Sequence, residues 1–184
     1  EVIHDVGGRR LEPCADGMVP IHASEVGEIL FGEPLTVYAS KMGVETEDSY
    51  LMRRGLRMED AIADEYAEQT MRTVTKPSPY EIQRHPTIPW LRSTCDRFTV
   101  RYEGPAGRRS DGPLELKLAV GSYADWKDGP PLRHQIQVQI QVACARSQWG
   151  ALAGLLGPGP LQTFDLERDD EFLALALPHI EEFR

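Results

Sequence analysis

The chain has 184 residues, of which 41% are hydrophobic and 27% charged, and this is the composition of a globular protein rather than a disordered one. Its length predicts one domain over residues 1–184. The 20 Lys and Arg residues against 29 Asp and Glu give a net charge of −9, which argues against a protein that coats nucleic acid through bulk positive charge. A binder with a local basic groove stays open.

The sequence also bears on the compartment. No stretch reaches the roughly 18 apolar residues that a membrane span needs, and EVIHDVGGRR at the start lacks the apolar core of a signal peptide. The three cysteines (Cys14, Cys95 and Cys144) are widely spaced and form no C-x-x-C pair. That spacing is typical of reduced thiols rather than of a disulfide framework or a zinc or iron–sulfur site. We expect a cytoplasmic protein that contacts no membrane.

Predicted helices come first along the chain. Ser24 is a suitable N-cap for a short helix ending near Gly32, and a second helix within 36–43 stops at Gly43. The longest helical pattern covers 48–70. Five strand-like segments and a last helix follow, with strands at 72–81, 97–103, 114–120, 149–156 and 161–168 and the helix opened by Asp169 and Asp170.

This order predicts an α/β fold with a central mixed sheet flanked by helices. The helical part covers about 20–72 and the sheet-containing core about 73–184. Residues 135–142 read QIQVQIQV, and their strict alternation predicts a strand. As a helix, the same segment would place Gln137 and Gln141 one turn apart on a shared face without one clean apolar stripe.

Glu59 is unusual within its predicted helix, because it lies in the middle of the apolar stripe formed by Met52, Leu56, Ile62, Ala63 and Tyr66. A buried, unpaired carboxylate is unfavourable by several kcal/mol, so this side chain needs a cation beside it. Two interpretations remain. Either Glu59 belongs to a functional site, or the helix is rotated and Glu59 pairs with an arginine such as Arg57 or Arg92.

The segment 114–120, LELKLAV, places its leucines on one face and Glu115 and Lys117 on the other. Alone, this pattern is typical of a half-exposed strand. However, the turn-rich EGPAGRRSDGP precedes it, and a hairpin closing at 104–107 would set Asp96 directly opposite Glu115. This register requires a bulge at 111–113.

Two opposed carboxylates repel each other unless a cation lies between them, and hard oxygen ligands suit Mg²⁺ or Mn²⁺. Asp96 and Glu115 are therefore candidate metal ligands, with one or two ions bound, and the backbone carbonyl of Leu116 is a further candidate. Glu59 would complete the first ion's ligands through water or hold a second ion. Lys117 would position the attacking water or neutralise charge on a phosphate, which predicts phosphodiester hydrolysis.

The D-x(n)-E-x-K arrangement of CDRF and LELKL resembles the signature of the PD-(D/E)XK nuclease superfamily. Further segments occur in the order expected of the YqaJ-like viral recombinase family, to which lambda exonuclease belongs: IHASEVGEILFG, TVYASKMG, RRGLRMEDAI, HPTIPWLRSTCDRF, GPLELKLAV, PPLRHQIQVQIQV and FDLERDDEFLALALPHIEEF. The resemblance implies a restriction-endonuclease-like fold and a helix at 135–142. The sequence departs from the family pattern at Cys95, where a Pro is frequent, and at His134, where a Tyr is common.

Carried over by position, the resemblance makes Glu59 the helix carboxylate, Asp96 and Glu115 metal ligands and Lys117 the catalytic lysine. Gln137 matches the first Gln of the family's Q-V-Q motif, next to that lysine. A serine near a helix start contacts the DNA end in the family, and Ser24 occupies this position. Candidate DNA contacts are the arginines near these segments: Arg53, Arg54, Arg57, Arg92, Arg97, Arg108 and Arg109.

The function that follows is a Mg²⁺-dependent exonuclease acting on ends of double-stranded DNA for recombination by strand annealing. The resemblance implies 5′-to-3′ polarity, a ring-like homo-oligomer, a single-strand annealing protein as partner, and a bacterial or phage-infected cell. Two other functions stay open. One is an endonuclease of the same superfamily, and the other is a DNA-binding or assembly module with a decayed site.

Overall fold

The computed structural model describes residues 3–4, 10–11, 14, 17–44, 50–79, 81–103 and 107–184. Its helices are α1 (Ala23–Phe31), α2 (Pro34–Lys41), α3 (Tyr50–Thr70), the 3₁₀ helix η1 (Tyr123–Trp126), α4 (Leu132–Ala145) and α5 (Asp170–Phe183). Its strands are β1 (Ile3–His4), β2 (Arg10–Leu11), β3 (Ile21–His22), β4 (Val74–Thr75), β5 (Gln83–Arg84), β6 (Leu91–Ser93), β7 (Arg97–Glu103), β8 (Arg108–Leu118), β9 (Trp149–Leu155) and β10 (Gln162–Glu167).

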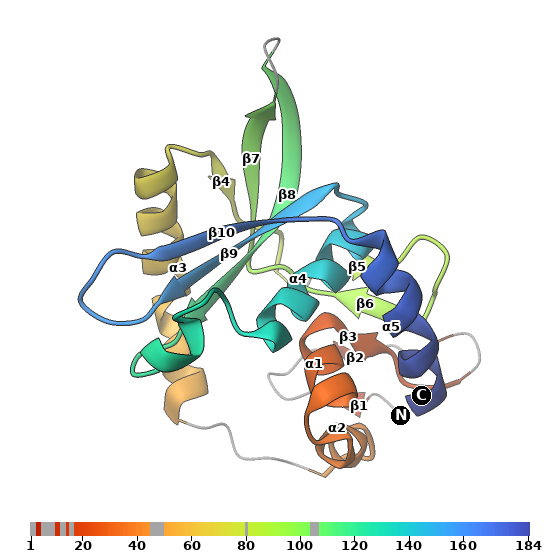
Figure 1. Ribbon diagram of the computed structural model, residues 1–184. Helices are drawn as coiled ribbons and strands as arrows, with labels where there is room; N and C mark the ends of the chain where they lie inside the picture. The colour runs from red at the N-terminus through yellow and green to blue at the C-terminus, as the bar shows by residue number, and fades with distance from the viewer. Residues whose placement is uncertain are drawn as a thin grey trace.

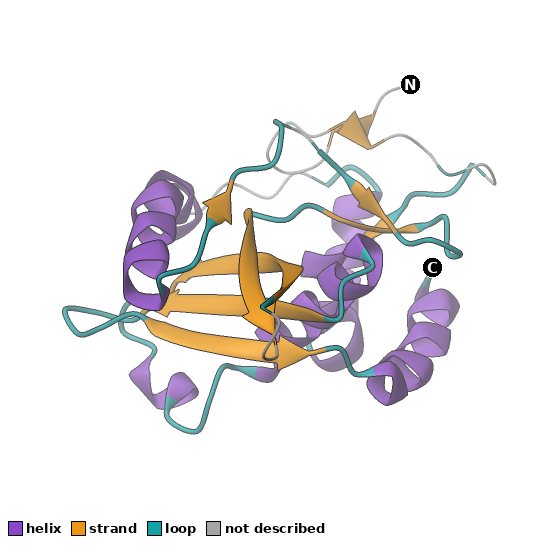
Figure 2. Ribbon diagram, turned by 90° about the horizontal axis from the view of Figure 1, so that it is seen from above, coloured by secondary structure: helices purple, strands orange, loops and turns teal. Residues whose placement is uncertain are grey.

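Five strands form the central sheet in the order β10-β9-β8-β7-β4. The β8–β9 pair is parallel and the other pairs are antiparallel, so the sheet is mixed, as the sequence predicts. Helices lie on both sides of it, and the β7–β8 hairpin projects beyond the helices (Figures 1 and 2). A smaller sheet of order β3-β6-β5 joins the N-terminal helices to the core. None of the helices in the described ranges is long and apolar enough to cross a membrane.

The two faces of the central sheet are covered by different helices. On one face, Ile62, Ala63 and Tyr66 of α3 pack against Leu114 and Leu116 of β8 and neighbouring residues of β9. On the other face, Val138 and Val142 of α4 pack against Leu152 of β9 together with Trp126 of η1. A third cluster joins α1, α4, α5 and β6. Helix α4 therefore lies between the sheet and the N-terminal helices.

The position of α4 explains the alternating sequence. Because successive residues turn by about 100°, Ile136 and Ile140 share one face of the helix, and Val138 and Val142 lie on the opposite face. The isoleucines pack with α1 and α5, while the valines pack with the sheet. A helix buried on two opposite faces thus shows a period of two, and the strand predicted from periodicity for 135–142 is wrong. The helix implied by the family resemblance is confirmed.

The hairpin register predicted from the turn is confirmed. The β7–β8 ladder runs from Arg97↔Leu114 to Glu103↔Arg108 without interruption, so the expected bulge at 111–113 is wrong. Gly112 pairs regularly with Thr99, and a Cβ there would approach the Trp149 carbonyl oxygen to 2.7 Å, so glycine permits this close contact with β9. The predicted closing turn includes residues 104–106, which lie outside the described residues.

Several predicted boundaries change. Helix α1 begins at Ala23 with His22 as its N-cap, so Ser24 lies in the first turn and is not the cap. The His22 backbone N–H donates to the Glu25 carboxylate at 2.8 Å, which explains the earlier start. The strand expected over 72–81 shortens to β4, and Tyr80 lies outside the described residues. The predicted helix start at 48–49 also lies outside them, whereas α5 begins as expected with Asp169 accepting from the Phe172 N–H at 2.8 Å.

The predicted state of the cysteines is confirmed. Cys14, Cys95 and Cys144 are buried thiols that form no disulfide with one another. Burial raises the pKa of Cys144 to about 12, so this thiol stays protonated and unreactive at neutral pH.

Candidate active site

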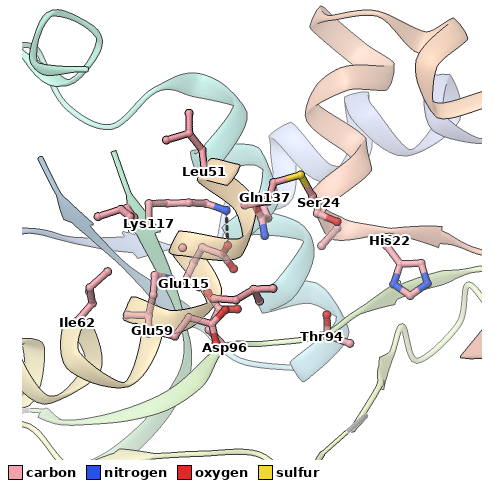
Figure 3. A pocket seen from close by; sticks show the side chains of 16 residues that line it. His22, Ser24, Leu51, Glu59, Ile62, Thr94, Asp96, Glu115, Lys117 and Gln137 are labelled. Carbon is pink, nitrogen blue, oxygen red and sulfur yellow. Dashed lines mark hydrogen bonds and ion pairs between the residues drawn. The ribbon is translucent and has the colours of Figure 1, made fainter. Parts of the chain in front are cut away.

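A cavity of about 470 Å³ opens between α3, the N-terminus of α1 and the end of β8 (Figure 3). This volume lies in the range of about 300–1,000 Å³ that is usual for ligand sites. Its lining brings together residues from five elements and from the connection before β7: His22, Ala23, Ser24, Leu51, Met52, Gly55, Leu56, Glu59, Ile62, Thr94, Asp96, Glu115, Leu116, Lys117, Leu118 and Gln137. Six of the side chains predicted for the site therefore meet in one cavity.

The end of the β7–β8 ladder creates this opening. Pairing stops at Arg97↔Leu114, but β8 continues to Leu118 with only β9 beside it. At the free edge, the Leu116 N–H donates to Asp96 Oδ2 at 2.8 Å. In an extended strand the N–H and C=O of one residue point to the same edge, so the Leu116 carbonyl also faces this side. The last residue before β7 thus meets the open edge of β8.

Glu115 is held by two side chains. Lys117 Nζ lies 2.6 Å from Glu115 Oε1, and Gln141 Nε2 donates to Glu115 Oε2 at 2.5 Å. The glutamate is only 3% exposed, so the interpretation of a half-exposed strand with Glu115 in water is wrong. An alternating strand presents this charge to the interior because α4 covers the face on which it lies.

The carboxylates in the cavity perturb one another. Burial first, and then the negative charge of Glu115, raise the pKa of Asp96 well above its usual value, although Lys117 opposes the shift. Burial acts to lower the pKa of Lys117, but the charges of Glu115, Asp96 and Glu59 outweigh it and raise the pKa. Lys117 is therefore a fixed ammonium, and it is the one Lys or Arg among the described residues that line the cavity.

Glu59 extends from α3 toward the same space as Asp96 and Glu115 (Figure 3). The helix is not rotated away, and one nearby cation is Arg97, whose guanidinium lies 3.9 Å from Glu59 Oε2. Arg97 is 4% exposed, donates to the Asp96 carbonyl oxygen at 2.5 Å and also pairs with Asp60. It thereby ties α3 to the start of β7. The first half of the apolar stripe is not buried, since Met52 and Leu56 are 51% and 61% exposed at the cavity.

The oxygen donors in the cavity fit a hard divalent cation. Asp96 and Glu115 repel each other in a buried site, and a cation would relieve the repulsion that raises the pKa of Asp96. In the described ranges, no group of three or more His, Cys, Asp or Glu side chains is arranged to hold a metal ion. Two carboxylates and the Leu116 carbonyl, completed by water, are then the ligands available, and Glu59 would act through water.

Comparison with known proteins identifies the family. The model of the YqaJ-like viral recombinase domain matches residues 23–148, which is more than half of the chain. The chain belongs to the YqaJ-like viral recombinase family. No curated protein matches this YqaJ-like chain significantly by sequence.

Solved structures show the same fold. An alkaline exonuclease from Laribacter hongkongensis, LHK-Exo, is 20% identical with a TM-score of 0.68, covering 89% of this chain and 85% of that one. Its complex with dAMP gives a TM-score of 0.69 at the same identity and coverage. A phage-related exonuclease from Haemophilus somnus is 12% identical with a TM-score of 0.66, covering 90% of this chain and 92% of that one. The YqaJ-like chain therefore has the lambda-exonuclease-like PD-(D/E)XK fold.

The predicted DNA contacts of the YqaJ-like chain differ in their surroundings. Ser24 is exposed at the N-terminus of α1 and lines the cavity, and Gln137 lines it from α4. Arg54 is exposed on α3, next to the lining residue Gly55. Arg92 is 4% exposed and points toward Cys14, with 4.0 Å between the guanidinium and Sγ. Direct contact of Arg92 with DNA remains a prediction that this geometry does not support.

The sequence did not predict the contacts that two residues make at the site. Gln141 is completely buried and contacts Glu115, and Arg97 joins α3 to the Asp96 segment. A signal for Gln141 exists in the sequence, because it lies one helical turn after Gln137. The signal for Arg97 is its position directly after Asp96, a candidate metal ligand. From the sequence, Arg97 is expected only as one of several DNA contacts.

Proposed function

We propose that this chain is a divalent-metal-dependent deoxyribonuclease that degrades double-stranded DNA from its ends, in the 5′-to-3′ direction, for recombination by strand annealing. One observation carries the proposal, namely the convergence of Asp96, Glu115 and Lys117 on a single cavity that Glu59 and Gln137 also line. Membership of a recombinase family supports the biological setting. The exonuclease activities named for structures of the same fold support the reaction.

The geometry of the cavity supports a role for each residue. Asp96, Glu115 and the Leu116 carbonyl would hold Mg²⁺ or Mn²⁺, with Glu59 acting through water or at a second ion. A bound divalent cation lowers the pKa of a water molecule and stabilises charge on a phosphate. Lys117, an ammonium beside Glu115, orients the attacking water or offsets the charge that builds on the phosphate oxygens. Gln137 lies beside it and would orient the same groups.

The DNA end would enter on the side of α1. Ser24 and the backbone N–H groups in the first turn of α1 border the cavity, and such groups suit a terminal phosphate. The complex of LHK-Exo with dAMP supports a site of nucleotide size in this fold. Arg54, exposed beside the cavity, would contact the phosphate backbone of the duplex.

The test uses linear duplex DNA labelled at its 5′ end, incubated with and without Mg²⁺. We expect metal-dependent release of label as mononucleotides, and loss of this release in Lys117→Ala. A duplex labelled at the 3′ end should release its label late, which gives the polarity. No metal-dependent degradation, or equal degradation by Lys117→Ala, contradicts the proposal. Cleavage of closed circular DNA would instead favour an endonuclease, because a circle has no end.

Two associations belong to the proposal. The resected strand would pass to a single-strand annealing protein, and copies of the chain would form a ring-like homo-oligomer around DNA. Family membership supports both. Light scattering during gel filtration would measure the oligomer, and a monomer at working concentration would contradict the ring.

A further inference from the structure

Gln141 is a polar side chain in an unusual position. It lies on α4 and is 0% exposed, and it does not line the cavity itself. Burying an amide is unfavourable unless it is hydrogen-bonded, so a glutamine here needs specific partners. An apolar residue of similar size would fill the same space without that requirement.

The Gln141 amide joins two segments of the candidate active site. Its Nε2 donates to Glu115 Oε2 at 2.5 Å and points toward the Thr94 carbonyl oxygen at 3.4 Å. Glu115 belongs to β8, and Thr94 lies two residues before Asp96 in the connection that leads to β7. A single NH₂ group therefore links the two chain segments that bring the opposed carboxylates together.

This contact also determines which oxygen of Glu115 faces the cavity. Oε2 is occupied from the protein interior by Gln141, whereas Oε1 lies against Lys117 at the cavity. Gln141 Oε1 is buried and has no hydrogen-bond partner among the described residues. Only the donor end of the amide is used, although a buried acceptor without a partner is unfavourable. The contacts that this amide makes are thus those of its Nε2 group, to Glu115 and to the Thr94 carbonyl oxygen.

We propose that Gln141 is a positioning residue that holds Glu115 and the Asp96 segment in the geometry that a divalent cation requires. This inference rests on the proposed function, since it assigns a supporting role for the same metal site. Groups that orient metal ligands typically contribute about 10–100-fold to metal affinity. The expected consequence is on the binding of the ion rather than on contact with DNA.

The same helix offers a matched control. Gln139 has the same side chain and is 9% exposed, but it faces the other side of α4. Its Nε2 donates to the Glu167 carbonyl oxygen at 2.7 Å, and its Oε1 accepts from the Asp169 N–H at 2.9 Å. Both ends of this amide therefore join α4 to the β10–α5 connection, and neither contacts the cavity.

The experiment compares Gln141→Met with Gln139→Met in the full chain. Mn²⁺ is titrated by calorimetry without DNA, and degradation of linear duplex is measured over a range of Mn²⁺ and DNA concentrations. We expect the Mn²⁺ dissociation constant of Gln141→Met to rise at least about 10-fold, with the KM for DNA unchanged and activity partly restored by excess Mn²⁺. Gln139→Met should bind Mn²⁺ like the wild type while its melting temperature falls more than that of Gln141→Met.

The other outcomes contradict the inference, the proposed function or both. Wild-type Mn²⁺ affinity in Gln141→Met, in a protein whose wild type degrades DNA, overturns the inference and leaves the proposed function intact. An equal loss of affinity in Gln139→Met also overturns it, because the effect would then belong to the helix as a whole. A wild type that neither binds Mn²⁺ nor degrades DNA contradicts the proposed function and the inference together. If circular dichroism shows that Gln141→Met is unfolded, Gln141→Asn, whose shorter amide cannot reach Glu115, tests the same expectation.

Discussion

The two ends of the central sheet carry charged groups that are arranged in opposite ways. Toward the β7–β8 hairpin, the guanidinium groups of Arg72 and Arg101 lie 5.2 and 4.3 Å from the ring of the buried Trp149. Each arginine also has a carboxylate partner: Arg72 pairs with Asp165 at 2.7 Å and Arg101 with Glu167 at 2.6 Å. Every charge in this cluster is balanced, so it covers Trp149 and needs no further ligand.

The cavity end is not balanced in this way. Three carboxylates, from Glu59, Asp96 and Glu115, line the cavity, and Lys117 is the one Lys or Arg among the described residues that line it. Arg97 contacts Glu59 and the Asp96 carbonyl oxygen, but it does not line the cavity. Balanced ion pairs are common on protein surfaces, whereas an excess of buried acids favours the binding of a cation. The comparison therefore separates a structural cluster from a functional one.

The largest expected effect comes from removing one of the excess acids. Asp96→Asn should reduce DNA degradation at least about 100-fold, because a proposed metal ligand is lost. In metal-free buffer at pH 7, its free energy of unfolding should increase by about 1 kcal/mol, since the repulsion with Glu115 disappears while the amide oxygen still accepts from the Leu116 N–H. Urea unfolding and the labelled-duplex assay measure both effects.

The raised pKa of Asp96 determines how the stability gained by Asp96→Asn changes with pH. Because folding raises the pKa of Asp96, the wild type loses stability as the pH rises above the usual aspartate pKa. The advantage of Asp96→Asn should therefore be small below about pH 4, where the carboxyl group is protonated in both states, and should grow above it. A variant that is less stable than the wild type at pH 7 would show that the cavity acids are already balanced.

The sequence predicted those parts of the molecule that depend on local signals. The turn before β8 predicts the register of β7 against β8, which ends at Arg97↔Leu114 and leaves Asp96 and Glu115 at the same cavity. Asp169 marked the start of α5 because capping depends on only a few neighbouring residues. The same holds for the alternation that separates Glu115 from the leucines around it.

The rest depends on tertiary contacts that no local pattern contains. The alternation in α4 reflects packing between two layers, which a single amphipathic pattern does not describe. The burial of Glu115 and its contact with Gln141 both follow from that packing. Strand β6 was missed because three buried residues, Leu91–Ser93, are too short a segment to show a period. The strand predicted over 72–81 shortens to Val74–Thr75, because only these two of its described residues pair with β7.

A smaller effect is expected in the balanced cluster. Arg101→Met should lower the free energy of unfolding by about 1 kcal/mol, because it removes both the stacking on Trp149 and the pair with Glu167. DNA degradation by the folded variant should be unchanged, since the cluster lies away from the cavity. Arg109→Met, which removes an exposed pair with Asp111, is the control and should change stability less. A loss of activity in folded Arg101→Met would show that the cluster around Trp149 affects the cavity, which would contradict the separation of a structural cluster from a functional one.

The smallest effect is expected at the rim of the acid-rich cavity, where Arg54 is exposed beside Gly55. If its guanidinium contacts a phosphate, Arg54→Gln should weaken duplex binding a few-fold and reduce the slope of log affinity against log salt by about 0.9. Fluorescence anisotropy with Mg²⁺ measures this, with both proteins in the Lys117→Ala background so that the DNA stays intact. Arg109→Gln is the matched control: the sequence also suggests Arg109 as a DNA contact, but it lies on β8 about 23 Å along the strand from Leu116 at about 3.3 Å per residue. Equal salt slopes for Arg54→Gln and Arg109→Gln would mean that binding follows the overall charge of the chain rather than a groove beside the cavity.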